Sequence, residues 1–279
     1  MADNMHRTSS EVSVLVPQQW SQKWYEVLLA ELPFNSLVSR DYEGEIKQLG
    51  DTVRISTIPE FDEAIELAED AKADASAVTA TQQSLVINKR IVKDFIVTSK
   101  AQMQSIPFVD KLRDMAIYAI QKKMQAIIIS LTVPSASAPD HQISYDSGTT
   151  LALADILEAK ELKDAQNVPL SNRHSVLGSA QLNDVYNITG FISSDFLVSG
   201  APLSSGELPP LVGYMPHFTT VVGNTSYWFH SSYFTMATQQ ELAIGEYDLG
   251  VDGVRGKRVN VDVLAGFLQL DNKRVVTIS

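Results

Sequence analysis

The 279-residue chain contains no cysteine. This absence excludes disulfide bonds, thiol catalysis and cysteine-ligated zinc, and it is typical of a protein made in a reducing cytoplasm. The chain also lacks an apolar run of the roughly 18 residues that a membrane-spanning helix needs, since the longest candidate is the short stretch 126–133. The first residues lack the basic and apolar regions of a secretory signal. We therefore expect neither secretion nor a membrane partner.

Basic residues are few. There are 22 Lys and Arg against 33 Asp and Glu, which gives a formal net charge of −11. A protein that grips nucleic acid by its phosphates needs clustered Lys and Arg, so this balance argues against that mode of binding. It is compatible with a protein that encloses DNA without recognising its sequence, although most acidic proteins have no such role.

Motifs for catalysis are also absent from the sequence. The five histidines are scattered, with no HExxH and no i, i+4 pair, and isolated histidines of this kind are mostly structural or exposed. The three glycines of 250–256 lack the order and the following helix of a dinucleotide-binding loop, so this stretch predicts a turn. Because so many acids could include a catalytic carboxylate pair, an acidic cytosolic hydrolase stays an alternative. Apart from this, we expect no enzyme activity, cofactor or metal site.

The most informative feature that is present is a strand that leads out and returns. Gly50-Asp51 is turn chemistry, and the alternation that follows, with Val53 and Ile55, predicts a strand over 52–58. The runs 84–88 and 91–99 predict the return. Between them, residues 60–74 hold seven acids and one lysine. Their apolar residues fall at helical spacing but are mostly alanine, so we expect a short helix that buries too little surface to be rigid alone.

A long helix is predicted after this excursion. Pro107 marks its first turn, apolar residues recur at helical spacing from Phe108, and Pro134 ends it. About 25 residues at ~1.5 Å each would make a rod of roughly 37 Å. The remaining predicted elements are a helix over 18–32 ended by a proline, a connector over 135–149, helices over 150–166 and 179–188, and strands over 173–177, 227–237 and 259–278.

In residue types and spacing, DYEGEI (41–46) followed by GDTVRI (50–55) resembles the start of the extended loop in major capsid proteins of tailed bacteriophages. The order of elements from about residue 34 to the end also resembles that family. Two departures are Pro216-His217, where a glycine is usual, and the helical pattern of the loop tip. The resemblance implies an α+β, Hong Kong 97-type phage capsid fold. Such a fold has an N-terminal arm, an extended loop, a peripheral domain with a long spine helix, and an axial domain.

This resemblance implies a division of the chain into six parts. They are an N-terminal arm (1–36), the start of the peripheral domain with the first loop strand (37–58), the extended-loop tip (59–83), the loop return with spine helix and connector (84–149), the axial domain (150–249), and C-terminal strands of the peripheral domain (250–279). It also implies a virion protein, assembled in the host cytoplasm, that forms hexamers and pentamers around double-stranded DNA. The implied partners are copies of itself, a separate scaffolding protein, a portal, and decoration or cement proteins.

Two regions are candidate contacts between copies. We expect acids of the loop tip, Glu63, Glu66 and Asp70, to meet basic residues of an adjacent copy, among Arg40, Arg90, Lys93 and Arg113. The residues alone favour a solvated mobile loop, and the resemblance favours the arm. The helix that carries Trp20 and Trp24 fits two interpretations equally: it docks on its own domain, or it is an arm that docks on a neighbour. An encapsulin-like bacterial compartment shares the fold and stays an alternative, which would need a cargo-binding N-terminal helix.

Overall fold

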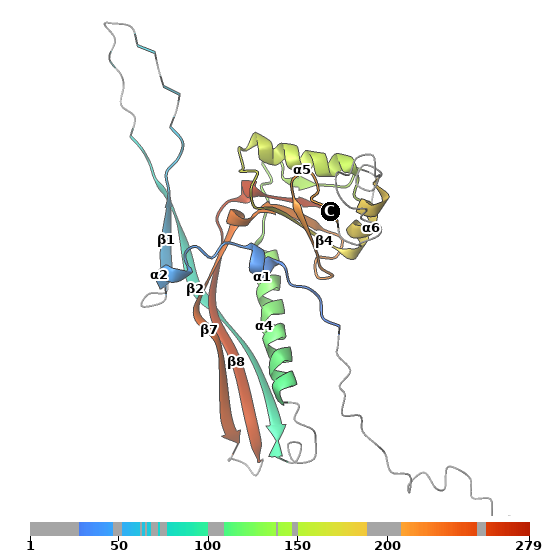
Figure 1. Cartoon of the computed structure of the whole chain (residues 1–279). Coiled ribbons are helices and arrows are strands. Elements are labelled where there is room, and N and C mark those ends of the chain that lie inside the picture. Colours follow the sequence, from blue (N-terminus) through green and yellow to red (C-terminus); the bar gives the residue numbers. More distant parts are fainter. Residues whose placement is uncertain are drawn as a thin grey trace, which may run out of the picture.

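The computed structural model describes residues 28–46, 52–61, 63–64, 66–67, 72, 77–99, 109–137, 139–146, 150–188, 208–249 and 255–279. In this part of the chain, two sheets and one long helix form the body, and a two-stranded ribbon projects from it (Figure 1). None of the described helices is long and apolar enough to cross a membrane. The predicted helix around Trp20 and Trp24 lies outside the described residues except for its last five.

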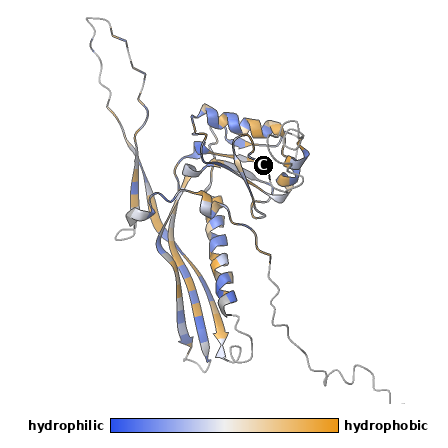
Figure 2. Cartoon of the chain, in the orientation of Figure 1, coloured by the Kyte–Doolittle hydropathy of each residue, from blue (hydrophilic) through white to orange (hydrophobic). Residues whose placement is uncertain are grey.

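The larger sheet has four antiparallel strands in the order β1-β2-β8-β7. Their bounds are β1 (Thr52–Thr57), β2 (Thr81–Thr98), β7 (Phe234–Leu249) and β8 (Gly256–Gln269). Apolar and polar residues alternate along the long strands (Figure 2), as a sheet with one covered face requires. The return strand, predicted as two runs, is one continuous strand, because a register shift between Ile87 and Lys89 carries it through the polar run at 88–90.

Helix α4 (Val109–Leu131) covers one face of this sheet. Its buried residues Ala116, Ile120, Met124 and Ile128 follow one another at four-residue spacing. They pack against alternate residues of β8, which bury Val259, Val261 and Val263 on the same face. The predicted long helix is therefore confirmed over 109–131, because a helical period and a strand period meet in one apolar core.

The smaller sheet has five strands in the order β3-β9-β6-β4-β5. The strands are β3 (Gln142–Ile143), β4 (Arg173–Leu177), β5 (Met215–Phe218), β6 (Ser226–His230) and β9 (Val275–Ile278). Helices α5 (Leu153–Ala165) and α6 (Ser179–Asn187) lie against it and bury Ile156 and Val185 over a core that includes Trp228 (Figure 1). The strand predicted over 173–177 and both predicted helices are confirmed.

The two sheets divide the chain differently from the sequence-based expectation. The expected division assigns β7 to 150–249 and β9 to 250–279, but β7 belongs to the larger sheet and β9 to the smaller one. Two passages of the chain between the sheets occur at 3-10 turns: from β6 to β7 at η2 (Ser231–Tyr233) and from β8 to β9 at η3 (Asn272–Arg274). The Leu270 N–H donates to the Tyr233 carbonyl at 2.8 Å, so the two crossings are fastened together. The aromatic strand predicted over 227–237 is accordingly split at η2.

Two helices predicted from spacing are wrong where the chain is described. Residues 28–32 are not helical. Tyr118 Oη donates to the Ala30 carbonyl, and Thr219 Oγ1 donates to the Glu31 carbonyl. These two hydrogen bonds keep the segment extended. The short helices here are α1 (Phe34–Leu37), after Pro33, and α2 (Glu43–Ile46). In the loop tip, the described residues of 60–74 are also not helical and are all exposed, since an alanine stripe offers little apolar area to bury.

Candidate assembly surfaces

The most exposed feature of the described chain is the ribbon that projects from the larger sheet (Figure 1). β1 pairs with β2 from Thr52 opposite Val86 to Thr57 opposite Thr81. Beyond this pairing, the described residues of 58–80 have no regular structure and are all exposed. Ile58 and Phe61 keep 69% and 71% of their surface in solvent. A single copy therefore leaves large apolar side chains uncovered beside many carboxylates.

The base of the ribbon is fixed by a small apolar cluster. Leu85 is fully buried and Ile87 nearly so, and both pack with Ala237 of β7. Val53 and Tyr42 complete this cluster from β1 and from the segment before it. The ribbon therefore leaves the body in a defined direction, although the described residues beyond its paired strands are exposed to solvent.

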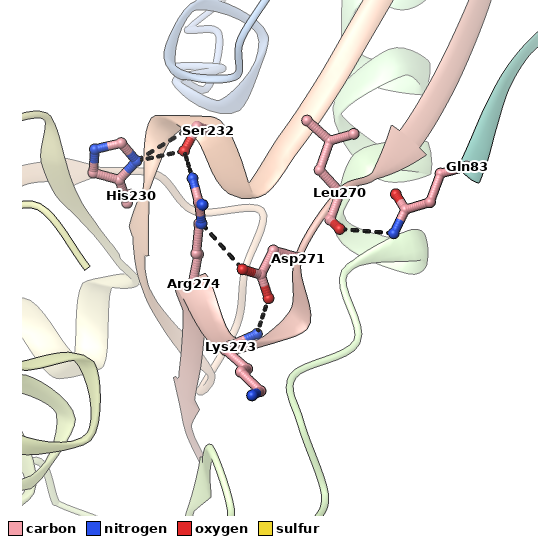
Figure 3. A network of polar contacts seen from close by, with 7 residues as sticks. All are labelled: Gln83, His230, Ser232, Leu270, Asp271, Lys273 and Arg274. Atoms are coloured by element: carbon pink, nitrogen blue, oxygen red, sulfur yellow. Dashed lines mark hydrogen bonds and ion pairs between the residues drawn. The ribbon is translucent and has the colours of Figure 1, made fainter. Parts of the chain in front are cut away.

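A polar network fastens the same base to the crossing turns (Figure 3). Gln83 Nε2 donates to the Leu270 carbonyl at 3.0 Å. Arg274 Nε donates to Asp271 Oδ2 at 3.1 Å, and its Nη1 donates to Ser232 Oγ at 2.5 Å. These bonds join β2, η2 and η3 at the point where both sheets meet. A groove of about 580 Å³ lies between this network and the ribbon.

The basic residues predicted to receive the acids are mostly engaged within their own chain. Arg90 donates from Nε and Nη2 to Asp262 Oδ2 at 3.0 and 2.9 Å. Arg113 forms an ion pair with Glu246. Arg40 Nη2 donates to the Asn35 carbonyl at 3.1 Å. The fourth candidate, Lys93, is exposed on β2 and makes no ion pair with a described residue. Lys93 is therefore the candidate whose charge is most available to another molecule.

The predicted acids and bases do not meet within one chain. Glu63 and Glu66 are exposed beyond the end of the β1–β2 pairing, while Lys93 lies on β2 in the groove beside α4. Asp70, Trp20 and Trp24 lie outside the described residues. A contact between these acids and Lys93 therefore needs a second copy, and it stays a prediction.

One surface was missed by sequence reasoning. A groove of about 330 Å³ lies between β2 and α4, and it is lined by residues 90–93 of the strand and by Ala119, Ile120 and Lys123 of the helix. Lys123 sits on the solvent side of an amphipathic helix, which is visible in the sequence. The sequence gives no signal, however, that β2 lies alongside this part of α4.

The smaller sheet encloses a cluster of buried polar groups. Lys163 is fully buried on α5, with Nζ 4.8 Å from the ring centroid of Tyr214. Arg173 lies near the same ring, and its Nη1 pairs with Asp164 Oδ1 at 2.7 Å. Burial, and then the charge of Arg173, holds the pKa of Lys163 well below its usual range. Burial also raises the pKa of Tyr214 to about 12. Because solvent does not reach Lys163, this cluster does not offer a substrate site.

Two histidines that are far apart in the sequence meet across the β4–β5 pair. His174 Nδ1 and His217 Nε2 are 3.2 Å apart, and burial lowers the pKa of both imidazoles. A cavity of about 450 Å³ beside His217 is otherwise lined by Glu31 and apolar side chains, with no hydroxyl or amine nucleophile among its described lining residues. No group of three or more His, Asp or Glu in the described chain is arranged to hold a metal ion. Among the described residues, this histidine pair therefore has neither a neighbouring nucleophile nor a set of metal ligands with which to act.

Comparison with known proteins gives similarity at the level of structure. Neither a protein-family model nor a curated protein matches the chain. A solved structure from Mycobacterium phage Che8 is 19% identical with a TM-score of 0.75, over 95% of this chain and 97% of that chain. The capsid of cyanophage P-SCSP1u is 11% identical with a TM-score of 0.78, over 96% of this chain and 93% of that chain. The mature capsid of bacteriophage PhiM1 is 10% identical with a TM-score of 0.69, over 100% and 96%.

At these identities the likeness shows the fold. The chain has the α+β, Hong Kong 97-type fold of tailed-phage capsid subunits along nearly its whole length, which confirms the expected fold class.

Proposed function

We propose that this chain is a major capsid protein, whose copies assemble into the icosahedral shell that encloses the double-stranded DNA of a tailed bacteriophage. The observation that carries this proposal is a near full-length match to capsid subunits in a chain whose ribbon leaves apolar and acidic surface exposed. Exposed apolar patches of this kind usually belong to contact surfaces. The ribbon would therefore have no structural role in a subunit that stays single.

In this proposal each part of the fold has a role in the shell. The larger sheet with α4 forms the peripheral domain, and the smaller sheet with α5 and α6 forms the axial domain around five- and six-fold positions. The ribbon and the N-terminal arm connect neighbours. Such contacts are heterologous, because each copy donates one surface and receives a different one, and they close into rings. Each contact can be weak, since many of them act together in a closed shell.

The proposed role is structural rather than enzymatic, and the proposed location is the virion after assembly in the host cytoplasm. A separate scaffolding protein, a portal and decoration or cement proteins are the partners that such a shell would use. Neither the fold comparisons nor the described cavities support the encapsulin-like compartment or the acidic hydrolase. DNA would be enclosed without recognition of its sequence, as the net charge of −11 suggests.

The salt dependence of assembly tests the ionic part of this proposal. Glu63 and Glu66 are exposed in the ribbon tip, and Lys93 is exposed on β2. We expect particle yield, measured by sedimentation and electron microscopy, to fall as salt is raised, because screening weakens contacts between exposed charges. Glu63→Gln with Glu66→Gln should lower the yield at low salt, and adding Asp70→Asn should lower it further.

A matched pair of acids elsewhere serves as the control. Glu158 and Glu161 are exposed on α5, and Glu158→Gln with Glu161→Gln removes the same two charges outside the ribbon. The control should keep the yield of the unmodified chain. Equal yields from the tip variant, the α5 variant and the unmodified chain at every salt concentration would contradict the ionic contact.

A further inference from the structure

One histidine lies at the junction where the two sheets meet (Figure 3). His230 is the last residue of β6, and its Nδ1 accepts a hydrogen bond from the Ser232 N–H at 3.2 Å, which caps the crossing turn η2. Because a backbone N–H can only donate, Nδ1 is the unprotonated nitrogen of this ring. Ser232 Oγ lies 2.8 Å from the same atom and so donates to it as well. The turn is therefore built on the neutral form of the imidazole.

The hydroxyl of Ser232 connects this histidine to the other crossing turn. Ser232 Oγ accepts from Arg274 Nη1 at 2.5 Å, and Arg274 Nε donates to Asp271 Oδ2 at 3.1 Å. The other oxygen of Asp271 accepts from the Lys273 N–H at 2.9 Å, which caps η3. A continuous chain of hydrogen bonds thus runs from His230 at the end of β6 to the turn between β8 and β9.

The ribbon is fastened to the same junction through Leu270. The Leu270 N–H donates to the Tyr233 carbonyl of η2 at 2.8 Å, and the Leu270 carbonyl accepts from Gln83 Nε2 at 3.0 Å. The Ser39 N–H donates to the Ser231 carbonyl at 3.2 Å, so the segment before β1 is also held by η2. The position of η2 therefore sets how the base of the ribbon sits on the two sheets.

The surroundings of His230 oppose a positive charge on its ring. The side chain is 8% exposed, and burial is the main cause that lowers the pKa of this imidazole. The nearby basic groups lower the pKa further, and a hydrogen bond with the Ser171 backbone acts in the opposite direction. The charged or titratable groups around His230 are Arg274 from η3, Lys163 from α5, Arg173 and His174 from β4, and the carboxylate of Asp271, which is taken up by Arg274.

A proton on Nδ1 would remove the lone pair on which the turn depends. The new N–H would face the Ser232 N–H, and two donors cannot bond to each other. Even if the Ser232 hydroxyl rotated to accept from the ring, one oxygen would then lie between the imidazolium and the Arg274 guanidinium. Protons can reach this network from solvent, because Ser232, Asp271 and Arg274 line the groove of about 580 Å³ beside the ribbon.

We propose that His230 is an acid-sensitive latch: uptake of a proton by its imidazole breaks the contacts with Ser232 and loosens the junction between the two sheets and the ribbon base. Loss of the proton closes the latch again. An open junction returns the ring to a pKa of about 6.5, so it binds the proton more tightly than the closed junction does. The open state therefore gains population as the pH falls below about 6.5.

Hydrogen exchange tests the latch in the full-length, unassembled chain. Exchange is read by mass spectrometry at pH 7.5 and 5.5 and corrected for the intrinsic effect of pH on amide exchange. Protection of residues 231–236 and 270–275 should fall by up to roughly tenfold at pH 5.5, since the open state gains about that factor over one pH unit. Helix α4 and the four strands of the larger sheet carry no histidine, so α4 should keep its protection. Unchanged protection at the junction, or an equal loss in α4, would overturn the latch.

The variant His230→Asn separates titration from structure. An Asn side-chain oxygen at this position can accept from the Ser232 N–H at any pH, as Asn does at helix N-caps. The variant should keep the protection of the junction at pH 7.5 and show no loss at pH 5.5. The matched control is His174→Asn, which removes another histidine of the smaller sheet, one that contacts His217 instead of the junction. The control should respond to acid as the original chain does. An acid response in His230→Asn equal to that of the original chain would overturn the assignment to His230.

Nuclear magnetic resonance titration of the His230 ring gives a second readout. Arg274→Gln removes the neighbouring cation and leaves Asp271 without it, so the midpoint should move to higher pH. Arg274→Lys keeps the charge and should leave the midpoint nearly unchanged. Equal midpoints in Arg274→Gln and the original chain would overturn the charge coupling on which the latch depends. The latch concerns the single chain, so its failure leaves the shell proposal standing, and a failure to form particles leaves the latch standing.

Discussion

Lys163 is the most unusual side chain in the described chain. Its ammonium group is fully buried, no hydrogen-bond acceptor among the described residues reaches Nζ, and Arg173 lies close by. The ring of Tyr214 attracts a cation, but it replaces lost hydration only in part. Folding therefore favours the uncharged amine, as the lowered pKa of Lys163 indicates. This residue weakens the smaller sheet rather than stabilising it.

Replacement of this lysine should stabilise the protein. Lys163→Met keeps the length of the side chain and removes the buried charge, so we expect the free energy of unfolding at pH 7 to rise by about 1–3 kcal/mol. The control is Lys160→Met on the same helix, whose Nζ pairs with Asp164 at 2.5 Å at the surface. A surface pair of this kind contributes about 0–1 kcal/mol. Urea unfolding of the unassembled chain measures both effects.

The buried Lys163 should also make the free energy of unfolding depend on pH in a defined direction. In the unfolded chain Lys163 regains a pKa of about 10.4, whereas the folded chain holds the pKa well below that value. Between the two values the unfolded chain binds more protons, so the free energy of unfolding rises with pH toward about 10. The Lys163→Met variant should lack this part of the slope. A variant that is less stable than the original chain at pH 7, with the same slope, would contradict the account.

Elements whose pattern is local were predictable from the sequence. Helix α4 shows its period at Ala116, Ile120, Met124 and Ile128, and β4 lies within five residues, so both are confirmed with small changes at the ends. The tip pattern at 60–74 has the spacing of a helix, but a helix needs a surface to pack on, and one copy provides none in the described chain.

Elements that depend on distant partners were not predictable. Ser231–Tyr233 continues a strand-like sequence, and only the Tyr233 carbonyl, which accepts from the Leu270 N–H, reveals the crossing between sheets. His174 and His217 are 43 residues apart and meet because β4 and β5 pair in parallel. The β2–α4 groove likewise depends on packing between elements, so the sequence around Lys123 does not predict that this residue lines a groove.

Excision of the ribbon tip should separate folding from assembly. Thr57 lies opposite Thr81 in the β1–β2 register, so an Asn-Gly turn in place of residues 58–80 closes a two-residue hairpin. The base cluster around Leu85 is untouched. We expect a free energy of unfolding within about 1 kcal/mol of the original chain and particle formation lowered by at least roughly tenfold, because multivalent contacts are lost.

Sedimentation velocity and urea unfolding check this excision variant. The single substitution Lys72→Ala, which leaves the tip in place, serves as its control and should assemble normally. An excised chain that forms closed particles as readily as the original would contradict the role of the tip.

A single copy of the whole molecule leaves large apolar and acidic surfaces uncovered in its described residues. In the described part of the chain, no strand pairs with the second half of β2 on the side opposite β8, and the ribbon ends in uncovered apolar and acidic residues. The fold that this chain shares with capsid subunits supports the proposal that neighbouring copies cover these residues. In the proposed shell, assembly covers the residues that folding leaves exposed.

Electron cryomicroscopy of the purified full-length protein tests this most directly. We expect closed particles built from five- and six-membered rings, with the ribbon tip of every subunit lying on the next copy. A stable monomer under all assembly conditions, with residues 58–80 folded firmly onto its own body, would contradict it.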